Sequence, residues 1–313
     1  MTPDRPAETT PLLNIDGVWA KAEHLNPSGS IKDRVARFVL ESDLREGRVR
    51  PGDQVVEPTS GNAGIALAFW AARLGLQAVV FMPENMTEER KRMIRGHGAR
   101  LVLTPEDEGV VGAIRGAREY AARTPRCRLL DQFDDPAAVE AQEHLGRECL
   151  AQLRAAGVTR VDAVVAGIGT GGTLVGAGGW LKKQGAAARL IAVEPEASPL
   201  VCKQLFGRAG PVSPATLFKY PLAVCHLQEG IGDGLVPGIV RRHRDLIDDA
   251  MLVADAEAIE EARRLNRLGH EVGPSSGTNL TIARRLARDG QVVLTFLCDR
   301  IDRYRSLPVF RDF

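Results

Sequence analysis

The chain has 313 residues, of which 44% are hydrophobic and 26% charged, a balance typical of globular proteins. Its formal net charge is only +1, which argues against a nucleic-acid partner. The cysteines are scattered, without a CxxC pair or a histidine at ligand spacing, so the sequence favours a reducing compartment and excludes the usual zinc-site patterns. No signal-like opening and no apolar run of membrane-spanning length is found. These features predict a cytoplasmic enzyme with no metal site and no membrane partner.

Short β-rich runs alternate with helical patterns along the chain. The stretch NPSGSIKDR, residues 26–34, predicts a turn that runs into a helix. The predicted strands then span residues 53–58, 77–83, 99–104, 127–133, 161–167, 189–195 and 291–298. The predicted helices span residues 63–76, 87–98, 109–123, 136–157, 172–185, 256–269 and 278–290. This alternation predicts an α/β fold with two domains, each a mostly parallel sheet with helices on both faces.

The first predicted helix carries an unusual residue. Lys32 falls in its first turn, where the helix dipole disfavours a cation. A lysine that is partly withdrawn from water at a helix N-terminus has a lowered pKa, which favours the neutral, nucleophilic amine. Taken alone, such a lysine is more often a surface charge, so its meaning depends on the rest of the sequence.

Three loops at the ends of predicted strands carry further polar groups, and ligands of parallel sheets gather at that edge. The loop at 57–65, EPTSGNAGI, offers the donors of an anion pocket, or else simply caps a helix. The loop at 166–176, AGIGTGGTLVG, lets the backbone approach an oxyanion, and phosphate is the expected ligand. The loop at 271–280, EVGPSSGTNL, again places serines at a helix start, where capping is the simpler alternative.

The second loop also fits a dinucleotide fingerprint. Residues 167–172 have the GxGxxG spacing, and Glu194 stands about where a ribose-binding acid would follow. An NAD-dependent dehydrogenase is therefore one alternative. It is weakened because such a fingerprint usually opens its domain, and because it leaves Lys32 without a role.

An enzyme that uses pyridoxal phosphate (PLP) accounts for these features together. The cofactor's phosphate requires a cradle of glycines and threonines, and its aldehyde requires a lysine amine for a Schiff base. Its ring nitrogen and phenolic oxygen each require a partner. The sequence therefore predicts PLP as the cofactor, attached to Lys32.

The ordered motifs resemble those of fold-type-II PLP enzymes, most closely the cysteine synthase (O-acetylserine sulfhydrylase) and cystathionine β-synthase family. The resemblance covers nearly the whole chain and is carried by KAEHLNPSGSIKDR, PGDQVVEPTSGNAGIALA, MPENMTEERKRMIRGHGARLVLTP, GIGTGGT, EGIGDGLVP, GPSSGTN and LCDRIDRY. It implies a smaller α/β domain at residues 26–146 and a larger, PLP-binding domain made of residues 1–25 and 147–313. The cofactor would lie in the cleft between them, and the protein would be a homodimer.

The resemblance also implies roles for individual residues. Lys32 would hold PLP, Asn62 would bond its phenolic oxygen, and Ser275 would face its ring nitrogen. The phosphate cradle would consist of Gly169, Thr170, Gly171, Gly172 and Thr173. The substrate would be bound by Thr59, Ser60 and Gln132 at its carboxylate and by Gly230 near its amine.

The implied reaction is a β-replacement on O-acetylserine. Lys32 would act as general base, loss of acetate would leave an α-aminoacrylate, and addition of sulfide would give L-cysteine. The substrate stays open, because Ala63 stands where the family usually has a second threonine. The alternatives are an O-phosphoserine sulfhydrylase, a cystathionine β-synthase, a cysteine desulfhydrase or a serine/threonine dehydratase, and, outside enzymes, a non-catalytic scaffold.

Overall fold

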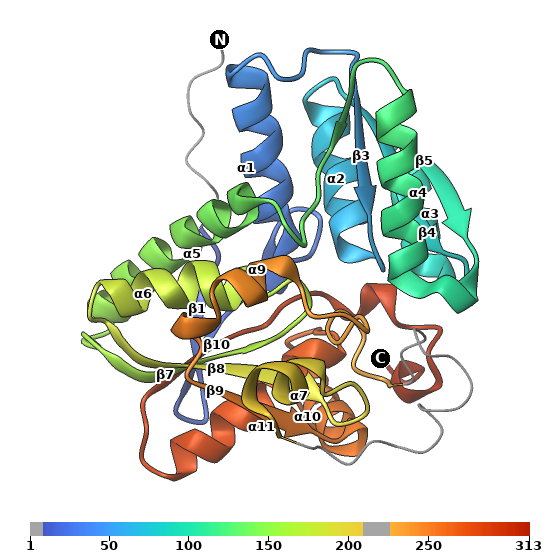
Figure 1. Cartoon of the computed structure of the whole chain (residues 1–313). Helices are drawn as coiled ribbons and strands as arrows, with labels where there is room; N and C mark the ends of the chain where they lie inside the picture. Colours follow the sequence, from blue (N-terminus) through green and yellow to red (C-terminus); the bar gives the residue numbers. More distant parts are fainter. Residues whose placement is uncertain (1–8, 209–225) are drawn as a thin grey trace.

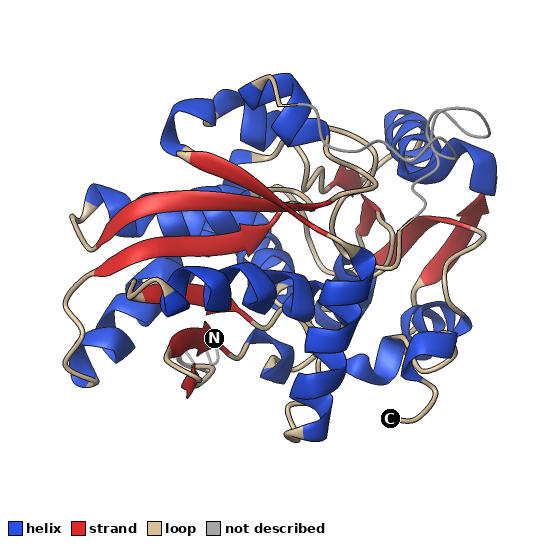
Figure 2. Cartoon of the chain, turned by 90° about the horizontal axis from the view of Figure 1, so that it is seen from below, coloured by secondary structure: helices blue, strands red, loops and turns tan. Residues whose placement is uncertain are grey.

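The computed structural model describes residues 9–208 and 226–313. In this part of the chain, two separate sheets are each covered by helices (Figure 1). Figure 2 shows the long strands of one sheet on one side of the molecule and the shorter strands of the other sheet beside them. The predicted α/β fold class is therefore confirmed. Within the described ranges, none of the helices has the length and apolar character needed to cross a membrane.

The larger sheet has six strands in the order β1-β2-β10-β7-β8-β9. The strands are β1 Leu12–Ile15, β2 Val18–Lys21, β7 Val161–Gly167, β8 Ala187–Pro195, β9 Asp249–Val253 and β10 Val293–Phe296. β1 and β2 are antiparallel, and their tight turn has positive φ angles at Asp16 (51°) and Gly17 (85°), as an Asp-Gly hairpin turn requires. The other neighbouring strands are parallel, so the loops that follow them open at one edge of the sheet.

The smaller sheet has four parallel strands in the order β5-β4-β3-β6. The strands are β3 Gln54–Pro58, β4 Gln77–Pro83, β5 Arg100–Thr104 and β6 Cys127–Leu129. Val55 and Val56 are both fully buried, although neighbouring residues of a strand point to opposite faces. Each belongs to a different apolar cluster, so both faces of this sheet are covered.

Helices surround both sheets and lead into the loops that follow the strands. The α-helices are α1 Lys32–Arg45, α2 Asn62–Arg73, α3 Glu88–Gly96, α4 Gly109–Arg123, α5 Pro136–Ala155, α6 Gly179–Lys183, α7 Leu200–Phe206, α9 Gly238–Arg242, α10 Asp255–Arg267 and α11 Pro274–Arg288. The 3-10 helices are η1 Glu23–Leu25, η2 Glu106–Glu108, η4 Arg244–Leu246, η5 Ile301–Arg303 and η6 Pro308–Phe310, and η3 Leu174–Gly178 is a π-helix.

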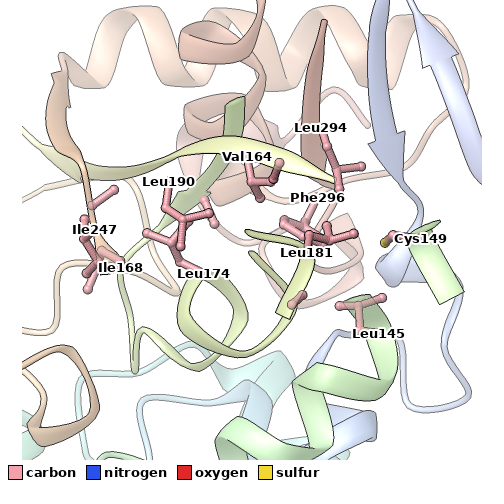
Figure 3. Close-up of a cluster of buried hydrophobic side chains, with 14 of the residues drawn as sticks. Leu145, Cys149, Val164, Ile168, Leu174, Leu181, Leu190, Ile247, Leu294 and Phe296 are labelled. Carbon is pink, nitrogen blue, oxygen red and sulfur yellow. The ribbon is translucent and has the colours of Figure 1, made fainter. Parts of the chain in front are cut away.

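The largest apolar cluster lies on the larger sheet (Figure 3). Val164, Leu190 and Leu294 project from three neighbouring strands and pack with Leu174 of η3 and Leu145 of α5. The strands of the smaller sheet all fall within residues 26–146, and those of the larger sheet fall outside that range. The domain boundaries themselves stay a prediction.

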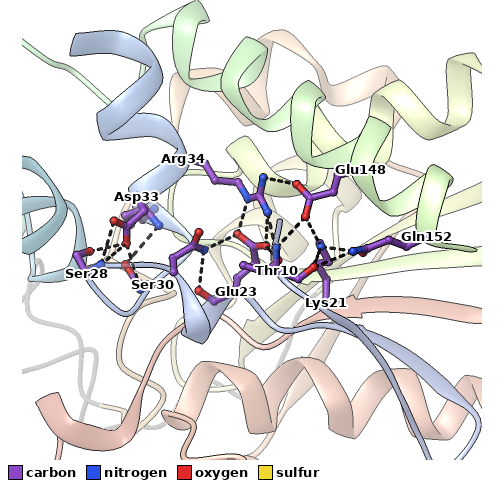
Figure 4. Close-up of polar contacts among 11 residues, drawn as sticks. Thr10, Lys21, Glu23, Ser28, Ser30, Asp33, Arg34, Glu148 and Gln152 are labelled. Atoms are coloured by element: carbon purple, nitrogen blue, oxygen red, sulfur yellow. Dashed lines mark hydrogen bonds and ion pairs between the residues drawn. The ribbon is translucent and has the colours of Figure 1, made fainter. Parts of the chain in front are cut away.

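A buried polar network fixes the beginning of α1 (Figure 4). The Arg34 guanidinium bonds the Glu23 carboxylate at 2.6 Å and the Glu148 carboxylate at 2.8 Å. Lys21 also forms an ion pair with Glu148, which links β2 to α5. Because Glu23 is fully buried, removal of Arg34 would leave an uncompensated charge, at a cost of about 3–5 kcal/mol. The network therefore holds α1 in place two residues beyond Lys32.

Candidate active site

The helix α1 begins at Lys32, so the lysine lies in its first turn, as the sequence predicts. No side chain caps its N-terminus directly. Instead, the Asp33 carboxylate accepts hydrogen bonds from Ser28 N at 3.1 Å and from Trp70 Nε1 at 2.7 Å. The acid that a first helical turn favours is thus present next to the lysine, and it closes the small-residue loop on itself. The Lys32 side chain takes no part in these hydrogen bonds.

Backbone hydrogen bonds join this loop to the segment that follows β10. Ile31 N donates to Cys298 O at 2.8 Å, and Arg300 N donates to Gly29 O at 3.1 Å. The start of α1 is therefore attached directly to the carboxyl edge of the larger sheet. As a result, Lys32 lies where loops from both sheets converge.

Lys32 lines a pocket that collects residues from widely separated parts of the chain. Of the predicted site residues, the pocket brings together Lys32, Thr59, Ser60, Asn62, Gln132, Thr170 and Gly230. Burial lowers the pKa of Lys32, and the opposing charge of Asp233 offsets part of that shift. The direction is the one predicted from the sequence, and it favours the neutral amine.

The loop after β7 makes a tight bend against α9. Gly171 has φ +79°, and a Cβ atom there would lie 2.2 Å from Val240 Cγ2, so only glycine fits. Thr170 Oγ1 accepts a hydrogen bond from Gly172 N at 3.3 Å, which stabilises the bend. Thr173 then precedes the π-helix η3. Backbone N–H groups at such a helix start are suited to a phosphate.

Three of the predicted site residues, Gly169, Asn62 and Ser275, lie around Gly230, whose φ is +96°. A Cβ atom built there would lie 3.7 Å from Ser275 Oγ and 3.9 Å from Asn62 Nδ2. A Cβ atom at Gly169 would lie 2.8 Å from Gly230 O. The structure thus brings together the loop at 166–176, called here the glycine loop, the loop at 57–65, called the asparagine loop, and the start of α11.

Asn62 is held by residues to which the sequence analysis gave no role. Its Nδ2 donates to Asp299 Oδ2 at 2.5 Å, and its Oδ1 accepts from Arg303 Nη1 at 2.7 Å. Asp299 also accepts a hydrogen bond from the Tyr304 hydroxyl. These contacts orient the Asn62 amide and leave the second hydrogen of Nδ2 for a ligand. The signal was the cluster of charged and aromatic residues in LCDRIDRY, which was quoted only as a motif.

Asp233 is a further residue that the sequence analysis missed, although it lies in the quoted motif EGIGDG. It lines the same pocket as Lys32. Burial raises the pKa of the Asp233 carboxyl, while the Lys32 charge and a hydrogen bond with Ser60 lower it in part. Each charge thus reduces the cost of burying the other, so the ionisation of Lys32 and that of Asp233 depend on each other.

This coupling predicts the effect of Asp233→Asn. Loss of the carboxylate lowers the pKa of Lys32 further, so the amine of the apoprotein is neutral at lower pH. We expect the pH midpoint for the rate of PLP recombination with the apoprotein to fall below that of the wild type. The measurement is recovery of the visible PLP band at several pH values. The control is Asp107→Asn on the exposed η2, and a midpoint that is the same in both variants would contradict the coupling.

Glu194 lies outside this pocket. Its buried carboxylate accepts hydrogen bonds from Val201 N and Cys202 N, both at 2.8 Å, at the start of α7. Because these bonds satisfy the N-terminus of a helix, the carboxylate is not available to a ribose. The acid on which the dinucleotide interpretation depended therefore has a structural role.

Comparison with known proteins assigns the family. The sequence profile of the pyridoxal-phosphate dependent enzymes matches residues 2–299. The chain belongs to this family. The cysteine synthase of Staphylococcus aureus (strain N315) is 39% identical to it over 302 residues, which cover 95% of this chain and 90% of that protein. The protein is thus a PLP-dependent enzyme of the cysteine synthase type, and the dehydrogenase and scaffold alternatives are wrong.

Solved structures agree in fold and show the range of reactions in the family. An O-acetylserine dependent cystathionine β-synthase from Helicobacter pylori has a TM-score of 0.84 and 33% identity, over 97% of this chain and 96% of that one. An O-ureido-L-serine synthase has a TM-score of 0.82 and 33% identity, over 96% and 92%. The names of these relatives describe different reactions, whereas the family match assigns PLP as the cofactor of this chain.

Proposed function

We propose that the protein catalyses a β-replacement that converts O-acetylserine and sulfide into L-cysteine and acetate. The observation that carries the proposal is the single pocket in which Lys32, with its lowered pKa, lies among the polar groups of the asparagine loop and the glycine loop. The similarity to cysteine synthases supports the choice of substrates.

The residues of the pocket fit PLP. Lys32 would hold its aldehyde carbon, and the backbone of residues 169–173 would hold its phosphate, in a bend where a Cβ atom at Gly171 would not fit. Ser275, which is 2% exposed, would face its ring nitrogen, and Asn62 would bond its phenolic oxygen. When bound, PLP supplies an electron sink for the α carbon of the substrate.

The chain's own groups then carry out the binding and the proton transfers. Thr59, Ser60 and Gln132 bind the substrate carboxylate and orient the α carbon. Lys32 Nζ removes the α proton, a step favoured because burial lowers the pKa of the amine. The C–O bond of the β carbon breaks with release of acetate, and the sulfur of sulfide forms a bond to the same carbon. Lys32 returns a proton to the α carbon.

A comparison of amino-acid donors tests this proposal. The holoenzyme is supplied with sulfide and with O-acetylserine, O-phosphoserine or serine, and L-cysteine is quantified. We expect kcat/KM for O-acetylserine to exceed that for serine by at least about tenfold, because acetate is a better leaving group than hydroxide. A higher kcat/KM for serine, or rapid sulfide release from cysteine, would assign the chain to another of the alternatives.

Ala63 offers a second test within the same pocket, because it lies beside Asn62 and lines the pocket without a polar side chain. Ala63→Thr adds a hydroxyl where the substrate carboxylate is proposed to bind. We expect KM for O-acetylserine to fall by about tenfold, as one hydrogen bond to a charged group allows, with little change in kcat. Ala63→Val has the same shape without the hydroxyl and is the matched control. Equal KM values for the two variants would show that no carboxylate binds at this position.

We also propose that the enzyme is a cytoplasmic homodimer. The family resemblance supports the dimer, and the free thiols of Cys127, Cys149, Cys202 and Cys298 are consistent with a reducing compartment. Sedimentation should give twice the chain mass of 33.9 kDa. A mass of one chain at micromolar concentration would contradict the dimer.

A further inference from the structure

A buried arginine lies beside the active-site pocket without lining it. Arg303 is the last residue of η5, and its side chain is 0% exposed. Burial of a guanidinium is costly unless its hydrogens have partners. Arg303 Nε faces Asp302 Oδ1 at 3.2 Å, which compensates part of the charge. The function proposed above gives this residue no role.

The other two nitrogens of Arg303 join two loops of the active site. Nη1 donates to Asn62 Oδ1 at 2.7 Å, and Nη2 donates to Ser28 O at 3.0 Å. Ser28 lies in the segment 26–34, which ends just beyond Lys32 and which we call the lysine loop. One rigid, planar group therefore links the asparagine loop to the lysine loop.

The lysine loop is shaped to receive this guanidinium. Gly29 has φ +87°, and a Cβ atom there would lie 2.5 Å from Arg303 Nη2 and 2.7 Å from Arg300 Nε. A side chain at this position would displace Arg303, so glycine is required. The backbone that Arg303 bonds is itself fixed, because Ser28 N donates to the Asp33 carboxylate at 3.1 Å.

The contacts of Asn62 determine which atom of its amide faces the pocket. A guanidinium can only donate, so Arg303 requires the carbonyl oxygen of the amide. At the other end of the amide, Nδ2 donates to Asp299 Oδ2 at 2.5 Å. The terminal torsion of asparagine has a broad energy minimum, so loss of either contact allows the amide to turn. With both contacts in place, Nδ2 keeps one hydrogen for the pocket, and a negatively charged oxygen requires such a donor.

We propose that Arg303 is a positioning residue, whose guanidinium fixes the Asn62 amide relative to the lysine loop so that Nδ2 meets the phenolic oxygen of PLP. The aldehyde carbon and the phenolic oxygen are attached to neighbouring carbons of the PLP ring, so Lys32 and Asn62 must be held at a matched spacing. A group that bonds both loops sets this spacing. The inference rests on the proposed role of Asn62, and not on which amino acid or nucleophile the enzyme uses.

The test titrates the apoprotein with PLP and records the Kd and the absorption spectrum. Bound PLP absorbs in the visible when its phenolic oxygen is negatively charged, and in the near ultraviolet when that oxygen is protonated. Arg303→Lys keeps a positive charge but has no planar fork that reaches both Asn62 Oδ1 and Ser28 O. We expect the Kd of PLP to rise about tenfold and the ratio of visible to near-ultraviolet absorbance to fall about tenfold, the factor that a hydrogen bond to a charged group supplies.

Asn62→Ala separates positioning from a general structural effect. This variant alone should raise the Kd and lower the absorbance ratio. Because Arg303 acts through Asn62, addition of Arg303→Lys to Asn62→Ala should change neither quantity by more than about twofold. Thr87→Val is the matched control: Thr87 Oγ1 donates to Arg303 O at 2.9 Å, so the change removes a neighbouring contact without touching the guanidinium. It should keep the wild-type Kd and absorbance ratio.

The proposal is overturned if Arg303→Lys keeps the wild-type Kd and absorbance ratio, or if its effect is equally large with and without the Asn62 side chain. If Arg303→Lys does not fold, Gly29→Ala applies the same test, because its Cβ displaces Nη2 while the arginine stays. Wild-type values in Gly29→Ala would overturn the proposal equally. Neither measurement uses O-acetylserine, so failure of the proposed reaction is detected separately, by the comparison of donors.

Discussion

Lys32→Ala is expected to abolish turnover and to remove the visible absorption band of lysine-bound PLP. Loss of a general base alone costs about 10²–10⁴-fold in rate, and loss of covalent attachment adds to this. Among the residues that the structure describes in this pocket, no other lysine could take over. The measurements are the absorption spectrum of the purified variant and its rate of cysteine formation.

The control for this variant is Lys203→Ala on α7, which does not line the pocket. It should keep the band and the wild-type rate. A Lys32→Ala variant that turned over at the wild-type rate would refute the role of Lys32 in every step derived above.

The second large effect is expected for Gly171→Ala in the glycine loop. Its positive φ disfavours any side chain, at about 1–2 kcal/mol, and the new Cβ would collide with Val240 of α9. The bend must open, which displaces the N–H groups that would hold the phosphate. We expect PLP affinity to fall by at least about tenfold, which corresponds to 1.4 kcal/mol, measured by titration of the apoprotein with PLP.

Gly185→Ala separates backbone strain from damage to the site. Gly185 also has a positive φ, +68°, but nothing lies within 4 Å of its Cβ position. The backbone strain in this variant should lower the free energy of unfolding about as much as the backbone strain in Gly171→Ala does. PLP affinity should be unchanged. If both variants weakened PLP binding equally, the loop at 171 would have no special role in holding the phosphate.

The parts of the fold and site that could be predicted from the sequence are those that short segments determine. The alternation of strands and helices gave the α/β class, and a lysine in a first helical turn singled out Lys32. A bend at Gly171 could be predicted because a run of glycines marks a tight turn of the backbone.

Contacts between distant segments could not be predicted in this way. Asn62 is fixed by Asp299, 237 residues further along the chain, and nothing local in either segment indicates that pairing. The dehydrogenase alternative places Glu194 at a ribose because an acid at a strand end fits that pattern, whereas the structure shows it at the start of α7. The raised pKa values of the Glu57 and Asp233 carboxyls likewise depend on burial, which only the packed structure supplies.

The most direct test of the account is the visible spectrum of the holoenzyme as O-acetylserine and then sulfide are added. The account predicts a visible PLP band that moves to longer wavelength with O-acetylserine, with release of one acetate per site. Sulfide should then restore the original band and release one L-cysteine per site. A band that O-acetylserine leaves unmoved, or a protein that shows no band after incubation with PLP, would contradict the proposed reaction.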